Sequence, residues 1–74
     1  MAKITIFSKN NCIQCKMTKK FLAENKAEFE EINLDENPDK ISYVKNLGFT
    51  AAPVIEAGEI SFSGFQPSRL KEII

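Results

Sequence analysis

Residues 4–24 of the chain read ITIFSKNNCIQCKMTKKFLAE, which is a short apolar run, a polar loop and a segment with helical periodicity. The run at 4–7 is β-branched and aromatic. It lacks the polar alternation of a half-exposed strand, so it is typical of a strand buried on both faces of a mostly parallel sheet. The stretch therefore predicts a strand, a loop and a helix over about 13–24, with two cysteines at the N-terminus of the helix.

The predicted helix is amphipathic. Residues at spacings of three and four define a face that we expect to pack on the strand, and this face consists of Cys15, Met17, Thr18, Phe21 and Leu22. The charged residues fall mainly elsewhere and are expected in solvent: Lys16, Lys19, Lys20 and Glu24.

A second strand and a second helix are predicted next. Residues 28–34 mix apolar and acidic side chains, as in a strand with one side near solvent. Asn37 and Pro38 are typical of an N-cap and a first helical position, and Gly48 of a left-handed C-cap. The apolar stripe of this helix would be Ile41, Val44 and Leu47.

The last third of the chain predicts a hairpin and a short helix. Residues 54–57 and 60–62 form two strand candidates around the turn Gly58-Glu59. Pro67 can open a final helix whose apolar face is Leu70, Ile73 and Ile74. The order βαβαββα predicts one α/β domain over residues 1–74, with a mixed four-stranded sheet flanked by three helices.

Charge and composition exclude several kinds of function. Ten Lys and Arg balance ten Asp and Glu, which removes the usual electrostatic argument for nucleic-acid or membrane partners. Residues 1–20 hold five lysines and no acid, whereas residues 28–39 hold six acids and no base. These runs are either solvated faces or two flanks that orient a protein partner. The absence of His excludes a Cys-His or Ser-His-Asp nucleophile.

The expected compartment is the cytoplasm. The apolar run near the start is too short for a signal-peptide core, and nothing later approaches a membrane span. Because cytoplasmic thiols are held reduced, the cysteine pair is more typical of a catalytic, redox-active or metal-binding site than of a structural disulfide.

The pair Cys12-Ile13-Gln14-Cys15 suits thiol–disulfide exchange. The unpaired N–H groups and the positive dipole end of the helix favour a thiolate at Cys12, and Lys9 or Lys16 add to this. Cys12 is therefore the predicted nucleophile. Cys15, one turn into the helix, is the predicted resolving thiol.

Other interpretations of the same residues stay open. The cysteines could be inert, or they could bind Cu(I), although small copper carriers have Met where Asn10 stands here. Structural zinc needs four ligands, and only two cysteines and no His exist. Pro53, before the third strand, could be an ordinary strand-start proline or a cis proline.

Across essentially all 74 residues, the chain resembles the glutaredoxin-like NrdH-redoxins of the thioredoxin-fold superfamily. Three segments carry the resemblance. The first is the CIQC site followed by Thr18-Lys19, and the second is Ala52-Pro53-Val54, similar to the family's cis-proline segment. The third, residues 61–67, is similar to a W-S-G-F-R-P signature but has Phe62 for Trp and Gln66 for Arg.

The resemblance implies the thioredoxin fold and a dithiol electron carrier with no bound cofactor and no metal. Such a carrier takes electrons from NADPH through thioredoxin reductase and passes them to the large subunit of a class Ib ribonucleotide reductase. A glutathione-dependent glutaredoxin is the alternative, although the chain lacks that group's Gly-Gly segment and acids after the hairpin. A CxxC metal carrier is the second alternative.

We expect a monomer, because such a carrier must dock with two different partners in turn through the same exposed sulfur. The resemblance implies that Pro53 is a cis proline and that the backbone of Ala52 pairs with an extended segment of the partner. The implied partner-binding residues are Ile13, Gln14, Ala52, Pro53, Phe62, Ser63, Gly64 and Phe65. For Phe62 a role in the core of the last strand is the alternative, whereas Phe65 is the better surface candidate.

Overall fold

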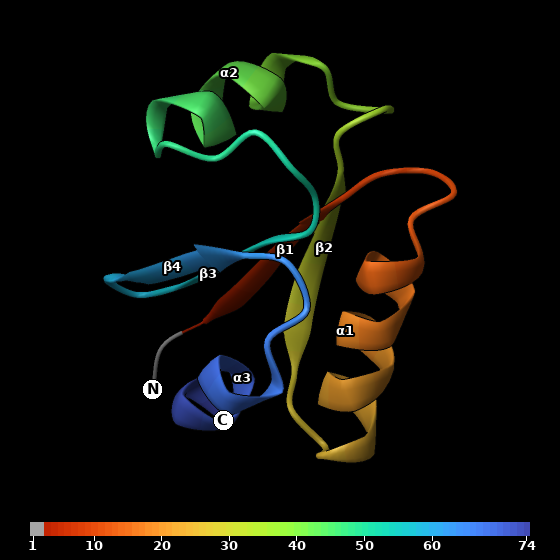
Figure 1. Cartoon of the computed structure of the whole chain (residues 1–74), viewed down its shortest axis with the longest axis vertical. Coiled ribbons are helices and arrows are strands. Elements are labelled where there is room, and N and C mark those ends of the chain that lie inside the picture. Colours follow the sequence, from red (N-terminus) through yellow and green to blue (C-terminus); the bar gives the residue numbers. More distant parts are fainter. Residues whose placement is uncertain (1–2) are drawn as a thin grey trace.

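The computed structural model describes residues 3–74, whose elements follow the predicted order βαβαββα (Figure 1). The strands are β1 (Ile4–Ser8), β2 (Phe29–Asn33), β3 (Val54–Ala57) and β4 (Ile60–Ser63). The helices are α1 (Ile13–Glu24), α2 (Asp39–Asn46) and α3 (Pro67–Ile73). The predicted domain also contains residues 1 and 2, which lie outside the described residues.

The four strands form one mixed sheet in the order β2-β1-β3-β4. β1 pairs with β2 in parallel through the crossover helix α1, and the β1–β3 and β3–β4 pairs are antiparallel. The hairpin between β3 and β4 turns at Gly58, whose positive φ of 62° suits glycine. The predicted mixed four-stranded sheet is therefore confirmed.

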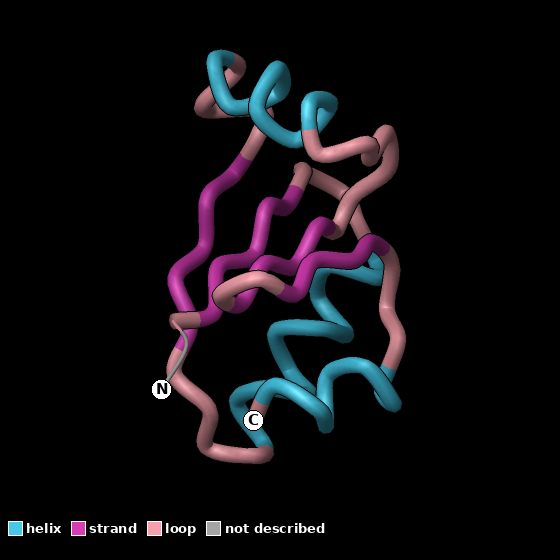
Figure 2. The backbone as a smooth tube through the Cα atoms, turned by 90° about the vertical axis from the view of Figure 1, so that its left-hand side faces the viewer, coloured by secondary structure: helices cyan, strands magenta, loops and turns pink. Residues whose placement is uncertain are grey.

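Helices cover both faces of the sheet, with α2 on one side and α1 and α3 on the other (Figure 2). Alternation along β1 turns Ile4 and Ile6 toward α1 and α3, and turns Phe7 toward α2. Ile6, Leu22, Ile55 and Leu70 are completely buried in the larger cluster. The prediction that the first strand is buried on both faces is confirmed, because apolar partners lie on either side of it.

α2 is fastened to the sheet by Tyr43. Its hydroxyl donates a hydrogen bond of 2.6 Å to the Glu56 carboxylate on β3, and its ring centroid lies 5.4 Å from that of Phe7. This hydrogen bond raises the pKa of Tyr43 above its ordinary value, since ionisation would set two negative charges side by side.

The start of α2 differs from the prediction. The helix begins at Asp39, and Pro38 rather than Asn37 is the residue that precedes it. The Asn37 side chain instead donates a hydrogen bond of 2.9 Å to the Asn33 carbonyl, so it closes the turn after β2. Gly48 follows α2 with a φ of 95°, which confirms the predicted left-handed end.

Three predicted core residues are exposed: Met17, Leu47 and Ile74. Met17 is 43% exposed because α1 buries only one side, which carries Cys15, Thr18 and Leu22. Leu47 and Ile74 each lie one residue beyond the end of their helix, so neither belongs to the helical face that packs on the sheet.

Candidate active site: a disulfide at the start of α1

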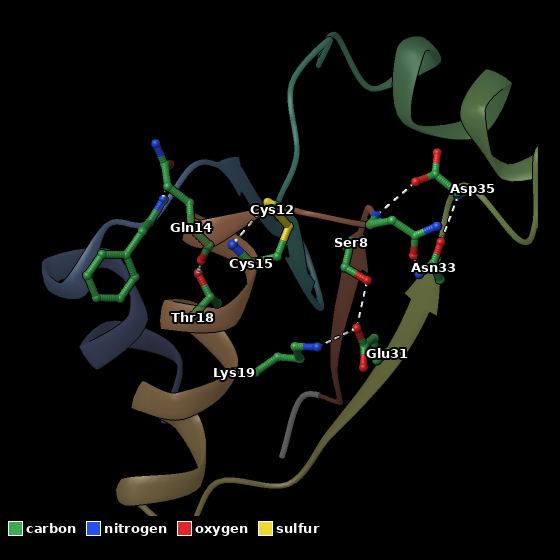
Figure 3. The surroundings of a disulfide bond; sticks show 11 residues. Ser8, Cys12, Gln14, Cys15, Thr18, Lys19, Glu31, Asn33 and Asp35 are labelled. Carbon is green, nitrogen blue, oxygen red and sulfur yellow. Dashed lines mark hydrogen bonds and ion pairs between the residues drawn. A yellow bond between two sulfur atoms is a disulfide. The ribbon is translucent and has the colours of Figure 1, made fainter.

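Cys12 and Cys15 form a disulfide at the N-terminus of α1 (Figure 3). Cys12 has extended backbone and is the N-cap, and its Sγ accepts a hydrogen bond of 3.1 Å from the Cys15 N–H. The sulfur thus satisfies one of the free N–H groups of the first helical turn, where the dipole favours negative charge. Cys15 is 2% exposed, whereas Cys12 is half-buried. Of the two cysteines, Cys12 is therefore the one that is accessible to solvent.

Gln14 ties the cysteine loop to the segment after β4. Its side-chain oxygen accepts a hydrogen bond of 3.0 Å from the Phe65 N–H, and its carbonyl accepts one of 2.8 Å from the Thr18 hydroxyl. Gly64, next to Phe65, has a φ of 83°, and a Cβ there would lie 3.4 Å from the Gln14 oxygen. The sequence offered no signal for this contact, because its two ends are 51 positions apart.

The Ala52–Pro53 peptide bond is cis, as the resemblance implies. Pro53 is buried, and its carbonyl accepts a hydrogen bond of 2.8 Å from the Gly64 N–H. Ser63, Gly64 and Ala52 are half-buried around it. Gly64 and Phe65 thus join the cis-proline turn to the cysteine loop, so the structure brings together three segments that are distant in the sequence.

The two phenylalanines of this region have different environments. Phe62 is 5% exposed within the core, with the Arg69 guanidinium 5.4 Å from its ring centroid. Its assignment to a surface docking patch is therefore corrected, because β4 turns its side chain inward and only the core alternative fits. Phe65 is half-buried and meets Phe21 edge to face at 6.2 Å.

A polar cluster lies between α1 and β2 beside the disulfide (Figure 3). The buried Ser8 hydroxyl donates a hydrogen bond of 2.7 Å to Glu31, and the Lys19 ammonium donates one of 2.8 Å to the same oxygen. The hydrogen bond from Lys19, followed by that from Ser8, holds the pKa of the Glu31 carboxyl below its ordinary value. Lys19 of the lysine run is thus paired with Glu31 of the acidic run, so for this lysine the alternative in which the run orients a partner does not fit.

The loop before Cys12 is held by side chains from the end of β2 and from the turn that follows it. The Asn10 N–H donates a hydrogen bond of 2.8 Å to Asp35, and the Asn33 amide donates one of 3.0 Å to the Asn10 side chain. Asn11, between Asn10 and Cys12, has a φ of 55°, which Asn tolerates better than most residues. Asn and Asp are typical of such turns. Their presence in the sequence did not indicate that the loop before Cys12 would bind the turn after β2.

Within residues 3–74, no helix has the length and apolar character needed to cross a membrane. The same part of the chain contains no group of three or more His, Cys, Asp or Glu side chains arranged to hold a metal ion.

Comparison with known proteins places this site in a family. A family model described as Glutaredoxin matches residues 4–60. The glutaredoxin-like protein NrdH of Lactococcus lactis subsp. lactis is 51% identical over 70 residues, covering 95% of this chain and 97% of that protein. NrdH of Escherichia coli K12 is 37% identical over 71 residues, covering 96% of this chain and 88% of that protein.

Solved structures agree with the sequence matches. The NrdH-redoxin of Escherichia coli superposes with a TM-score of 0.94 at 36% identity, covering 97% of this chain and 95% of that one. A glutaredoxin of Archaeoglobus fulgidus gives a TM-score of 0.87 at 29% identity, covering 99% and 86%. The chain, with its thioredoxin fold and its Cys12–Cys15 disulfide, therefore belongs to the glutaredoxin family and, within it, to the glutaredoxin-like NrdH redox proteins.

Proposed function

We propose that the protein is a dithiol electron carrier that thioredoxin reductase reduces with NADPH and that reduces the large subunit of a class Ib ribonucleotide reductase. The observation that carries this proposal is the disulfide between Cys12, which is partly accessible to solvent at a helix N-terminus, and the buried Cys15. The carrier binds no cofactor itself, acts in the cytoplasm and works as a monomer.

The exchange proceeds in two balanced steps. In the reduced protein, the Cys12 thiolate attacks one sulfur of the acceptor disulfide, which forms a mixed disulfide and expels the other acceptor sulfur as a thiolate. The Cys15 thiol then loses its proton and attacks Cys12 Sγ, which restores the Cys12–Cys15 disulfide and releases the second acceptor sulfur. The acceptor gains two electrons from the carrier and two protons, of which one is the proton that Cys15 loses and the other comes from the solvent that took up the Cys12 proton when the thiolate formed.

The different environments of the sulfurs support these roles. A nucleophile must meet the acceptor from solvent, which suits the half-buried Cys12. Cys12 Sγ accepts a hydrogen bond from the Cys15 N–H. The same hydrogen bond would stabilise a Cys12 thiolate, because hydrogen bonds to an anion are stronger than those to a neutral acceptor. Burial of Cys15 keeps it from competing for the acceptor, so it reacts only once the mixed disulfide lies beside it.

The choice of reductase is supported by the relatives. The solved NrdH-redoxin of Escherichia coli is described as a glutaredoxin-like protein with a thioredoxin-like activity profile. In this chain, residues 63–67 read SGFQP and contain no acid to hold the α-ammonium of glutathione. A missing charge-assisted hydrogen bond weakens binding by about 1.5–3 kcal/mol, which corresponds to roughly ten- to a hundredfold.

The deciding experiment measures NADPH oxidation in two coupled assays with the same disulfide substrate. One contains thioredoxin reductase, and the other contains glutathione and glutathione reductase. Fast oxidation in the first alone supports the proposal, and a class Ib ribonucleotide reductase is then tested as the acceptor. Oxidation in the second alone would make the protein a glutathione-dependent glutaredoxin. Silence in both would turn attention to Cu(I) binding.

A further inference from the structure

The outer face of α1 exposes apolar side chains beside the reactive sulfur. Ile13 directly follows Cys12 and is 74% exposed, and Met17, one turn along, is 43% exposed. Figure 1 shows α1 along the right-hand side of the molecule, with its outer side turned away from the sheet. Two large apolar groups left in water next to a redox site indicate a surface that a partner covers.

Two cations share this face. With 3.6 residues per turn, Ile13, Lys16, Met17 and Lys20 lie within an arc of about 100°; we call these four residues the α1 face. Lys16 and Lys20 are exposed and form no ion pair with any of residues 3–74. Lys19, which projects toward β2, is by contrast neutralised by Glu31.

Charged and apolar side chains lie on opposite edges of the α1 face. Lys16 and Lys20 occupy its edge toward β2, and the apolar edge continues from Met17 to the half-buried Phe21, which meets Phe65. A complementary surface must therefore bring carboxylates to one edge and aliphatic groups to the other. The two lysines are one turn apart, so the carboxylates should be spaced by about 6 Å.

We propose that the α1 face docks the acidic and aliphatic segment that carries the disulfide of the acceptor protein. This inference rests on the proposed carrier function. Both cysteines belong to the start of α1, so a partner held on the same helix keeps its sulfur bonded to Cys12 while Cys15 attacks. That attack by Cys15 is needed when an acceptor is reduced, whereas a reductase completes the reverse exchange with its own second thiol.

The test uses two synthetic peptides with an internal disulfide, identical except that one has Glu and Leu around the cysteines and the other has Lys and Leu. The pre-reduced protein is mixed with each peptide, and the second-order rate constant is divided by that for neutral hydroxyethyl disulfide. This division cancels any change in the reactivity of Cys12. At low ionic strength we expect a preference for the acidic peptide of about tenfold or more, which salt diminishes.

Reversing the charge of Lys16 and Lys20 tests whether these lysines cause the preference for the acidic peptide. The double variant Lys16→Glu/Lys20→Glu should lose or invert it, whereas Lys40→Glu/Lys71→Glu, with the same change in net charge outside α1, should retain it. Met17→Gln should lower the normalised rate with both peptides, because both carry Leu.

Several outcomes would overturn the inference. They are equal rates for the two peptides in the wild type, an unchanged preference in Lys16→Glu/Lys20→Glu, and equal losses in both double variants. If Lys16→Glu/Lys20→Glu slowed only re-reduction by thioredoxin reductase, the face would serve the reductase instead. Normal reduction of hydroxyethyl disulfide in these cases would leave the carrier function standing, whereas its absence in the wild type would refute both.

Discussion

The side-chain oxygen of Gln14 accepts a hydrogen bond from the backbone N–H of Phe65, 3.0 Å away and 51 positions later in the chain. Gly64, the residue before Phe65, donates its own N–H to the Pro53 carbonyl. Two adjacent N–H groups thus connect the cysteine loop and the cis-proline turn to one segment. A partner that binds at Cys12 meets a surface whose parts are already held in register.

Gln14→Leu should loosen this connection. The Phe65 N–H would lose its acceptor at a site that water can reach, so we expect a loss of at most about 1 kcal/mol in the free energy of unfolding, measured in urea. The larger effect should be on the rate with protein acceptors, because the segment at 63–65 gains freedom. Gln14→Glu keeps an acceptor oxygen and serves as the control. Equal acceptor rates in all three proteins would show that the contact has no part in exchange.

Gly64→Ala should destabilise the protein by about 1 kcal/mol, since a side chain is unfavourable at a φ of 83°. Gly48 is a matched control, because its φ is 95° and a Cβ there would have nothing within 4 Å. Thermal unfolding should show similar losses for Gly64→Ala and Gly48→Ala. Only Gly64→Ala should also slow acceptor reduction, and a slower rate in Gly48→Ala would trace the effect to stability alone.

Cys12→Ser should abolish disulfide reduction, whereas Cys15→Ser should attack an acceptor once and stop at the mixed disulfide. The reason is that only Cys15 can release the acceptor from Cys12. Mass spectrometry under non-reducing conditions should find one acceptor bound per Cys15→Ser chain. An adduct through Cys15 in the Cys12→Ser protein would reverse the assigned roles.

The reduced protein should contain one thiol that reacts at low pH. The first turn of α1 offers the Cys15 N–H and the helix dipole to Cys12, so iodoacetamide should still alkylate Cys12 well below the pKa of about 8.5 of a free cysteine. Cys15 should react slowly because it is buried. Two ordinary cysteine titrations would remove the helix N-terminus as the activating feature.

The Ser8–Glu31–Lys19 cluster should make stability depend on pH in acid. The pKa of Glu31 is lower in the folded protein than in the unfolded chain, so its contribution is complete above the unfolded value of about 4.3 and is lost as pH falls through the folded value. Urea midpoints from pH 7 to pH 3 should show a deficit for Glu31→Gln that shrinks in acid. The deficit at pH 7 should be about 1 kcal/mol or less, because the pair is partly exposed.

Glu28→Gln is the matched control for this experiment. Glu28 is exposed, lies just before the same strand, and makes no ion pair with the rest of residues 3–74. Its variant should follow the wild type at every pH. A Glu31→Gln deficit that stayed constant down to pH 3 would indicate lost packing rather than a lost charge.

Local features of the sequence sufficed for the order of the elements and for the start of α1. A β-branched run, helical spacing and glycines at turns act within a few residues, so the strands, the helices and the place of the cysteine pair at the N-terminus of α1 follow from them. The cis state of Pro53 was different. Its surroundings left two possibilities open, and the resemblance to a family decided between them correctly.

Only the tertiary structure decided which side chains face solvent and which distant groups meet. Helical spacing assigned Met17 to the core, but α1 buries just one side against the sheet, and Met17 lies outside it. Phe62 was open to either role until the pairing of β4 with β3 turned it inward. The contact of Gln14 with Phe65 and the cluster around Glu31 join residues 51 and 23 positions apart. Such contacts depend on how the elements pack together, and no local pattern of residues carries that information.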